Sequence, residues 1–206
     1  MRISSRWLAA LALFLATPTL TTAQERDGLW LGAGVVVGAA ALRCDTCEDG
    51  RDISGGLSIR AGWTANERLL IGGEFNGIAM FGSANLTLAA ALREEDVPVT
   101  FFLYNVLGTV TLYPKASWGF FLKGGAGLSG AEIDVDLVGS AFTAELGNGL
   151  GLLAGAGYDI RVGRRISVAP AVNFSYSRLG TVEGLSSERL KWKHNVVDFT
   201  VGVTFH

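Results

Sequence analysis

Charged side chains are scarce in this 206-residue chain, where Lys, Arg, Asp and Glu together make up 17% of the residues. The 17 basic and 19 acidic residues leave a formal net charge of −2, which gives no electrostatic reason to expect a nucleic acid as partner. Long apolar runs are also missing beyond the first two dozen residues, although the mean hydropathy is +0.35. A membrane-spanning helix needs about 18 consecutive apolar residues, so the apolar side chains must belong to another kind of structure.

The N-terminal segment is typical of a secretory signal peptide. Arg2 and Arg6 give it a basic start, residues 7–16 form an apolar run too short to span a membrane, and residues 21–23 are small, as signal peptidase requires. We therefore expect cleavage after Ala23. Removal of the two arginines leaves 15 basic and 19 acidic residues, a net charge of −4.

Cysteine and histidine are equally rare, with two of each. Cys44 and Cys47 form a C-x-x-C motif, but no second cysteine pair and no nearby histidine completes four metal ligands. Because an exported chain passes through an oxidising compartment, we expect a disulfide between them, with redox catalysis or metal binding as the alternative. No metal or other cofactor is expected. His194 and His206 offer few bases for a catalytic nucleophile.

Apolar and polar residues alternate through eight segments of the chain. In the last segment, Phe199 and Phe205 belong to an apolar set at every second position, and this period of two indicates a β-strand with one apolar face. Each segment has roughly ten residues, enough to cross a bilayer when tilted. The expected strands cover residues 29–37, 53–63, 69–76, 99–113, 118–129, 149–162, 166–177 and 196–206.

The connections between these segments alternate in length. We expect long loops at residues 39–52, 82–98, 131–146 and 178–195, with short turns between them. Both chain ends then lie on the short-turn side, which is the periplasmic side in transmembrane barrels. Aromatic residues near the two rims are expected to lie at the membrane–water boundary, namely Trp63, Tyr113, Trp118, Tyr158 and, at the opposite rim, Trp192.

The chain resembles the outer membrane protein β-barrel domain family of small eight-stranded barrels. The resemblance is carried by the signal peptide, the segment GTVTLYP at 108–114, residues 120–127 and the alternating closing strand. The family usually ends on Phe or Trp, whereas here Phe205 is followed by His206. The resemblance implies an all-β, eight-stranded antiparallel up-and-down transmembrane β-barrel in the bacterial outer membrane. The expected division is a signal peptide at 1–23 and one barrel domain at 24–206.

The inner face of such a barrel would hold three positive and three negative residues: Arg60, Glu74, Lys123, Asp159, Arg161 and Asp198. An eight-stranded barrel is just wide enough inside for its own side chains. We therefore expect a charge-paired, hydrogen-bonded network that fills the lumen. The alternative is a narrow aqueous path, because many inward positions are glycines that leave volume unfilled.

Function is expected to reside in the loops, since a rigid scaffold lets loops carry binding. We expect a monomer with a structural or surface-interaction role and no enzymatic activity. Its partners would be outer-membrane lipids, including lipopolysaccharide, and the barrel insertion machinery. A narrow solute pore and, less favoured, a lipid A-modifying enzyme or a soluble lipocalin-like barrel are the alternatives. Residues 190–194 combine cations with Trp192, which suits contact with lipopolysaccharide phosphates or a host surface, or simple anchoring at the interface.

Overall fold

A computed structural model describes residues 26–43, 51–84, 97–137, 140–183 and 189–206. No helix in these ranges is long and apolar enough to cross a membrane. The strands are β1 (Leu29–Arg43), β2 (Asp52–Asn66), β3 (Leu69–Ala84), β4 (Val97–Leu112), β5 (Phe120–Leu137), β6 (Ser140–Tyr158), β7 (Ile160–Arg161), β8 (Ile166–Glu183) and β9 (Arg189–Phe205).

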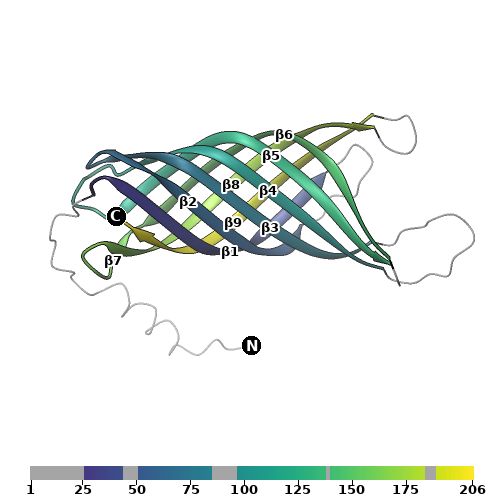
Figure 1. Cartoon of the computed structure of the whole chain (residues 1–206), viewed down its shortest axis with the longest axis horizontal. Helices are drawn as coiled ribbons and strands as arrows, with labels where there is room; N and C mark the ends of the chain where they lie inside the picture. Colours follow the sequence, from purple (N-terminus) through teal and green to yellow (C-terminus); the bar gives the residue numbers. More distant parts are fainter. Residues whose placement is uncertain (1–25, 44–50, 85–96, 138–139, 184–188) are drawn as a thin grey trace, which may run out of the picture.

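The strands form one closed antiparallel ring. Each strand from β1 to β5 pairs with the next one along the chain, as do β7 with β8 and β8 with β9. The ring is completed by the pairing of β1 with β9 and of β6 with β8. The short β7 continues β6, because Gly157 pairs with Ala171 and Ile160 with Val168 in the same register on β8. Asp159 alone separates the two pieces, so the ring has eight strands, and the predicted fold class is confirmed. Figure 1 shows these strands running obliquely along the long axis.

Short turns and long hairpins lie at opposite ends of the ring. We call the end that holds the C-terminus and β7, on the left in Figure 1, the turn end. The other end, where β5–β6 and β8–β9 extend furthest, is the loop end. The amide of Thr64 donates a hydrogen bond to the carbonyl of Gly28, which ties the start of β1 to the turn end of β2.

Several predicted boundaries are wrong, because the strands continue further toward the loop end. Residues 131–146, predicted as a loop, are mostly paired strand, and the ladder between β5 and β6 runs on to Leu137 and Ser140. Here Glu132 lies opposite Glu145 on the outer face, so polar residues replace the apolar ones. Residues 131–136 still alternate between apolar and polar types, but the outward positions are now the polar ones, so the apolar outer face that marks the other strands is missing. The predicted loops at 39–52, 82–98 and 178–195 are shortened in the same way, and β5 starts at Phe120 rather than at Trp118.

The outer surface of the ring is apolar over most of its height. On β9, Phe199, Val201 and Val203 are exposed, whereas Asp198 and Thr204 at the alternate positions are buried, which is the reverse of a soluble barrel. We call this outward surface the apolar band; its members include Leu31, Val35, Leu57, Ile59, Ile71, Phe75, Val106, Val110, Leu122, Leu128, Leu150, Leu152, Val172, Phe174, Val197, Phe199 and Val201.

Candidate functional site

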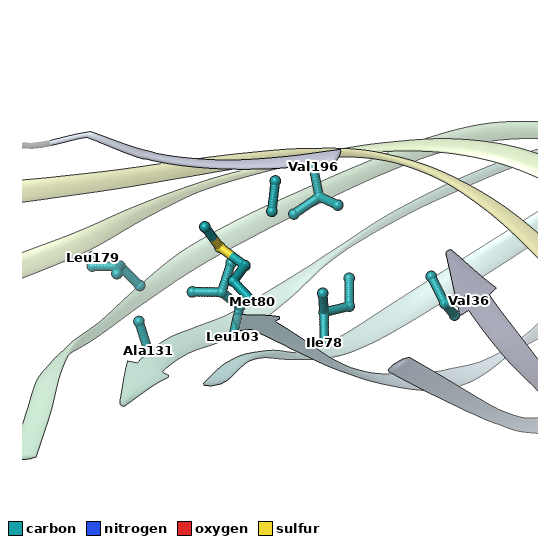
Figure 2. Packing of buried hydrophobic residues seen from close by; sticks show 8 residues of the cluster. Val36, Ile78, Met80, Leu103, Ala131, Leu179 and Val196 are labelled. Carbon is teal, nitrogen blue, oxygen red and sulfur yellow. The ribbon is translucent and has the colours of Figure 1, made fainter. Parts of the chain in front are cut away.

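The interior near the loop end is filled by apolar side chains, which we call the loop-end cluster. Figure 2 shows them reaching into the space between the ribbons from several strands. Sequence periodicity does not reveal these inward residues. Leu103, for example, lies between the outward Phe102 and Tyr104, so inward and outward positions are both apolar there and do not alternate in polarity. The members of the cluster are Val36, Ala40, Ile78, Met80, Leu103, Ala131, Leu179 and Val196, with Phe101 packed against them.

A second buried apolar cluster, the turn-end cluster, lies toward the opposite end of the lumen. It contains Trp30, Leu70, Tyr113, Phe121, Ala169 and Ala171. The prediction that Tyr113 is an interfacial aromatic residue is wrong. Its neighbour Leu112 faces outward, so the alternation turns Tyr113 inward, where it is 3% exposed and packs on Phe121 with ring centroids 5.7 Å apart.

Large side chains cover the inward glycines near the turn end. A Cβ atom on either Gly62 or Gly72 would lie 2.7 Å from Cζ2 of Trp30, so the indole occupies the space beside both glycines. A Cβ on Gly157 would lie 2.5 Å from Cζ of Phe121. These glycines therefore make room for aromatic rings from other strands rather than leaving an open path.

Two of the six predicted interior charges form a salt bridge. Lys123 Nζ donates to both carboxylate oxygens of Glu74, at 2.7 and 2.8 Å, although β3 and β5 are separated by β4. Asn76 Nδ2 donates a further hydrogen bond to Glu74 Oε1 at 3.1 Å. Both charged side chains are buried, so each compensates the other where little water reaches them.

Arg60 and Asp198 bind neutral polar groups instead. Arg60 Nη2 donates to Thr204 Oγ1 at 2.6 Å. Asp198 Oδ1 accepts hydrogen bonds from Asn173 Nδ2 at 2.7 Å and from Thr200 Oγ1 at 2.8 Å. The middle of the lumen thus combines one salt bridge with hydrogen bonds to amides and hydroxyls.

Arg26, a residue outside the strands, occupies the mouth of the turn end. Its side chain is buried, its guanidinium carbon lies 3.5 Å from the centroid of the Tyr113 ring, and its Nη atoms donate to the carbonyls of Ala116 at 3.1 Å and Trp118 at 3.0 Å. Strand periodicity contains no signal for such a residue. Arg26 thereby joins the start of the barrel to the turn between β4 and β5.

The remaining two predicted charges also lie at the turn end. Asp159 is buried and accepts a hydrogen bond from the Tyr113 hydroxyl, and Arg26 Nε lies 3.9 Å from its Oδ2. Arg161 Nη1 donates to the carbonyl of Arg164 in the adjoining turn at 2.7 Å. The C-terminal His206 reaches Ser167 Oγ at 3.1 Å through Nε2. Polar contacts therefore surround the turn-end cluster.

A buried polar cluster lies beside the loop-end cluster. Ser129 Oγ is 2.5 Å from Asn105 Oδ1, 2.7 Å from Ser177 Oγ and 3.0 Å from His194 Nε2. This places a hydroxyl next to an imidazole, but Ser129 is 1% exposed, so a substrate cannot reach it in this conformation. The imidazole Nδ1 is buried without a hydrogen-bond partner among the described residues.

Trp63, Trp118 and Tyr158 are about half exposed near the turn end, and Phe199 and Phe205 are half exposed on the outer face of β9. These positions fit contact with lipid. The predicted signal peptide, the predicted disulfide between Cys44 and Cys47, and the side chain of Trp192 lie outside the described residues and side chains.

The closed ring, its apolar outer face and its polar and aromatic interior define a small barrel of the outer-membrane type. Residues 8–205 match the family described as "Outer membrane protein beta-barrel domain", and the chain belongs to this family. No curated protein matches the sequence.

Solved structures share the fold at low sequence identity. Neisserial surface protein A is 17% identical, with a TM-score of 0.56 over 87% of this chain and 97% of that one. Ail, the attachment invasion locus protein of Yersinia pestis, is 13% identical, with a TM-score of 0.50 over 86% and 99%. The outer membrane protein OprG from Pseudomonas aeruginosa is 14% identical, with a TM-score of 0.48 over 88% and 98%.

Proposed function

We propose that this protein is a monomeric bacterial outer-membrane barrel with a filled lumen, which serves a structural or surface-interaction role. Its turn end faces the periplasm and its loop end faces the cell exterior. Each of the eight strands pairs on both sides, and hydrocarbon offers no partner to a free backbone group, which supports membrane residence. A closed ring also offers no strand edge to a second copy.

The filled lumen is the part of the proposal that excludes a pore. The observation that carries it is the position of Trp30, whose indole occupies the space beside the inward Gly62 and Gly72. Apolar clusters lie toward both ends of the lumen, and Glu74 and Lys123 neutralise each other between them. Passage of a hydrated solute would require these packed layers to separate.

The lipids around the apolar band, including lipopolysaccharide, are its proposed partners in the membrane. The barrel insertion machinery is its proposed partner during assembly and would act on β9, which ends on Phe205. The Ser129–His194 pair is assigned a packing role, because a buried hydroxyl gives no access to a substrate.

Single-channel recording in planar bilayers tests the filled lumen. We expect no steady openings from the folded protein. The double variant Trp30→Ala with Met80→Ala, which removes one large side chain from each apolar cluster, provides the matched comparison. Steady openings of the wild type that change when Arg60 or Glu74 is neutralised would overturn the proposal in favour of a pore.

A further inference from the structure

Strand β6 leaves the closed ring at the loop end. Its last pair with β8 joins Gly149 to Leu179. Within the described part of the chain, Ser140–Asn148 pair with β5 alone, so the other edge of this stretch, here called the free edge, has no strand beside it. In Figure 1 the β8–β9 hairpin leaves the loop end at the upper right and the β5–β6 hairpin at the lower right. At about 3.3 Å per residue, the free edge is about 30 Å long.

Two β-bulges separate β6 from β8 at this point. On β6, Leu146 is an extra residue between the pairs that Gly147 and Glu145 make with β5. Gly147 has a φ of 125°, a conformation that glycine adopts without strain. On β8, the register with β9 shifts between Arg178 and Thr181, directly at the last pair with β6. A bulge bends its strand and ends pairing. Because both neighbours bend at the same level, the free edge is a built feature of the fold.

The free edge lies beyond the apolar band. On β6 the band ends at Leu150, and Asn148 and Glu145 further along the strand toward the loop end are polar and exposed. Hydrocarbon offers no partner to the backbone groups of an unpaired edge. Water can solvate them, and so can the backbone of another chain.

The base of the free edge is held in place by neighbouring strands. The Tyr104 hydroxyl on β4 donates a hydrogen bond to Asn148 Oδ1 on β6 at 2.7 Å. The Tyr104 ring reaches across β5 at Gly130, where a Cβ atom would overlap the hydroxyl. Pairing between β4 and β5 continues as far as Val99 and Val135. The free edge therefore belongs to a sheet of three strands, β4 to β6, that is formed before any partner arrives.

The sheet beside the free edge carries charge of one sign. Residues 131–148 contain four acidic residues and no basic one. Glu132 on β5 lies directly opposite Glu145 on β6, and like charges in such positions destabilise a sheet. A strand with lysine or arginine side chains beside β6 would relieve this repulsion. Two copies of this chain that met edge to edge would instead bring two acidic faces together, so the charge disfavours a second copy as the partner.

We propose that the free edge of β6 binds an extended, basic segment of another protein, which adds to the sheet as a further strand outside the cell. Main-chain hydrogen bonds to Ser140–Asn148 supply the affinity, and alternate side chains of the added strand supply the specificity. Cations on its outward face lie beside Glu145. This inference rests on the proposed outer-membrane location and gives the proposed surface-interaction role a place and a class of partner.

The test measures backbone amide hydrogen exchange by NMR for the folded protein in phosphatidylcholine nanodiscs. The probe is a synthetic peptide of about ten residues that alternates lysine and threonine, long enough to cover the free edge. At a peptide concentration about ten times its dissociation constant, exchange at the amides that it covers within residues 140–148 should slow about tenfold. A peptide that alternates lysine and proline has the same charge but lacks half of the N–H donors, so it should not slow exchange there.

Two variants test the charge. Glu145→Gln should weaken binding of the lysine–threonine peptide by up to about fivefold, since it removes one pair of opposite charges across strands. Glu67→Gln removes the same charge from an exposed position in the turn between β2 and β3 and should leave binding unchanged. Folding is checked in each sample by heat-dependent gel mobility.

Binding of the lysine–threonine peptide without slower exchange at residues 140–148 would overturn the inference, as would equal binding of the lysine–proline peptide. Slower exchange along β8 instead would overturn the assignment to β6. Equal binding by Glu145→Gln and the wild type would overturn the preference for a basic partner. No binding by a folded, non-conducting barrel removes this inference and leaves the proposed outer-membrane barrel with a filled lumen intact.

Discussion

Lys123 Nζ lies within hydrogen-bond distance of both carboxylate oxygens of Glu74, and the pair is buried in the middle of the barrel. Removing one partner leaves the other charged in a site of low polarity. We expect Lys123→Met to lower the free energy of unfolding by about 3–5 kcal/mol. Urea titration of the barrel in lipid vesicles measures this change.

The double variant Glu74→Met with Lys123→Met is the informative control. Replacing both charges with apolar side chains removes the penalty of an unpaired ion, so its stability should lie within about 1 kcal/mol of the wild type. If the double variant were as unstable as Lys123→Met alone, avoiding an unpaired buried charge would not explain the loss. The attraction between Glu74 and Lys123 would then itself stabilise the barrel.

Trp30 provides a test of how the interior is packed. Its indole is 4% exposed and covers Gly62 and Gly72. Trp30→Ala leaves a cavity and should cost about 3–5 kcal/mol of unfolding free energy. Trp63→Ala is the matched control, because Trp63 is mostly exposed on the outer surface; we expect a smaller loss there. Equal losses at the two positions would argue that Trp30 does not fill the lumen.

Arg26 should act as an anchor for the turn end. Its guanidinium donates to the carbonyls of Ala116 and Trp118 and lies over Tyr113. Arg26→Gln removes these charge-assisted contacts and should lower stability by about 2–3 kcal/mol. Amide hydrogen exchange of residues 113–119 should rise in parallel. Arg68→Gln, an exposed arginine in the neighbouring turn, should change neither quantity.

The lipid-facing half of the barrel could be predicted from the sequence, because hydrocarbon demands an apolar residue at every second position, as in Phe199, Val201 and Val203. The interior obeys no such rule. Leu103 and Met80 are as apolar as their outward neighbours, so alternation does not distinguish a lumen cluster from the outer surface. Lumen packing depends on which side chains meet across the ring.

For the charged residues, too, the sequence predicts which face a side chain occupies but not which residue it contacts. The inward positions of Glu74 and Lys123 followed from alternation, but their partnership depends on the two side chains meeting inside the ring over the intervening strand β4. Arg26 lies outside the strands and so outside any periodic pattern. The extension of β5 and β6 was assigned to a loop because Glu132 and Glu145 place polar groups at outward positions, although residues 131–136 still alternate and the ladder continues.

The most direct test of a closed, lipid-embedded barrel is gel mobility of boiled and unboiled protein recovered from fractionated cells. We predict that the protein is found in the outer-membrane fraction and that the unboiled form migrates differently, because a ring with every strand paired resists detergent until it is heated. Recovery from the periplasmic fraction, with migration indifferent to boiling, would contradict the account.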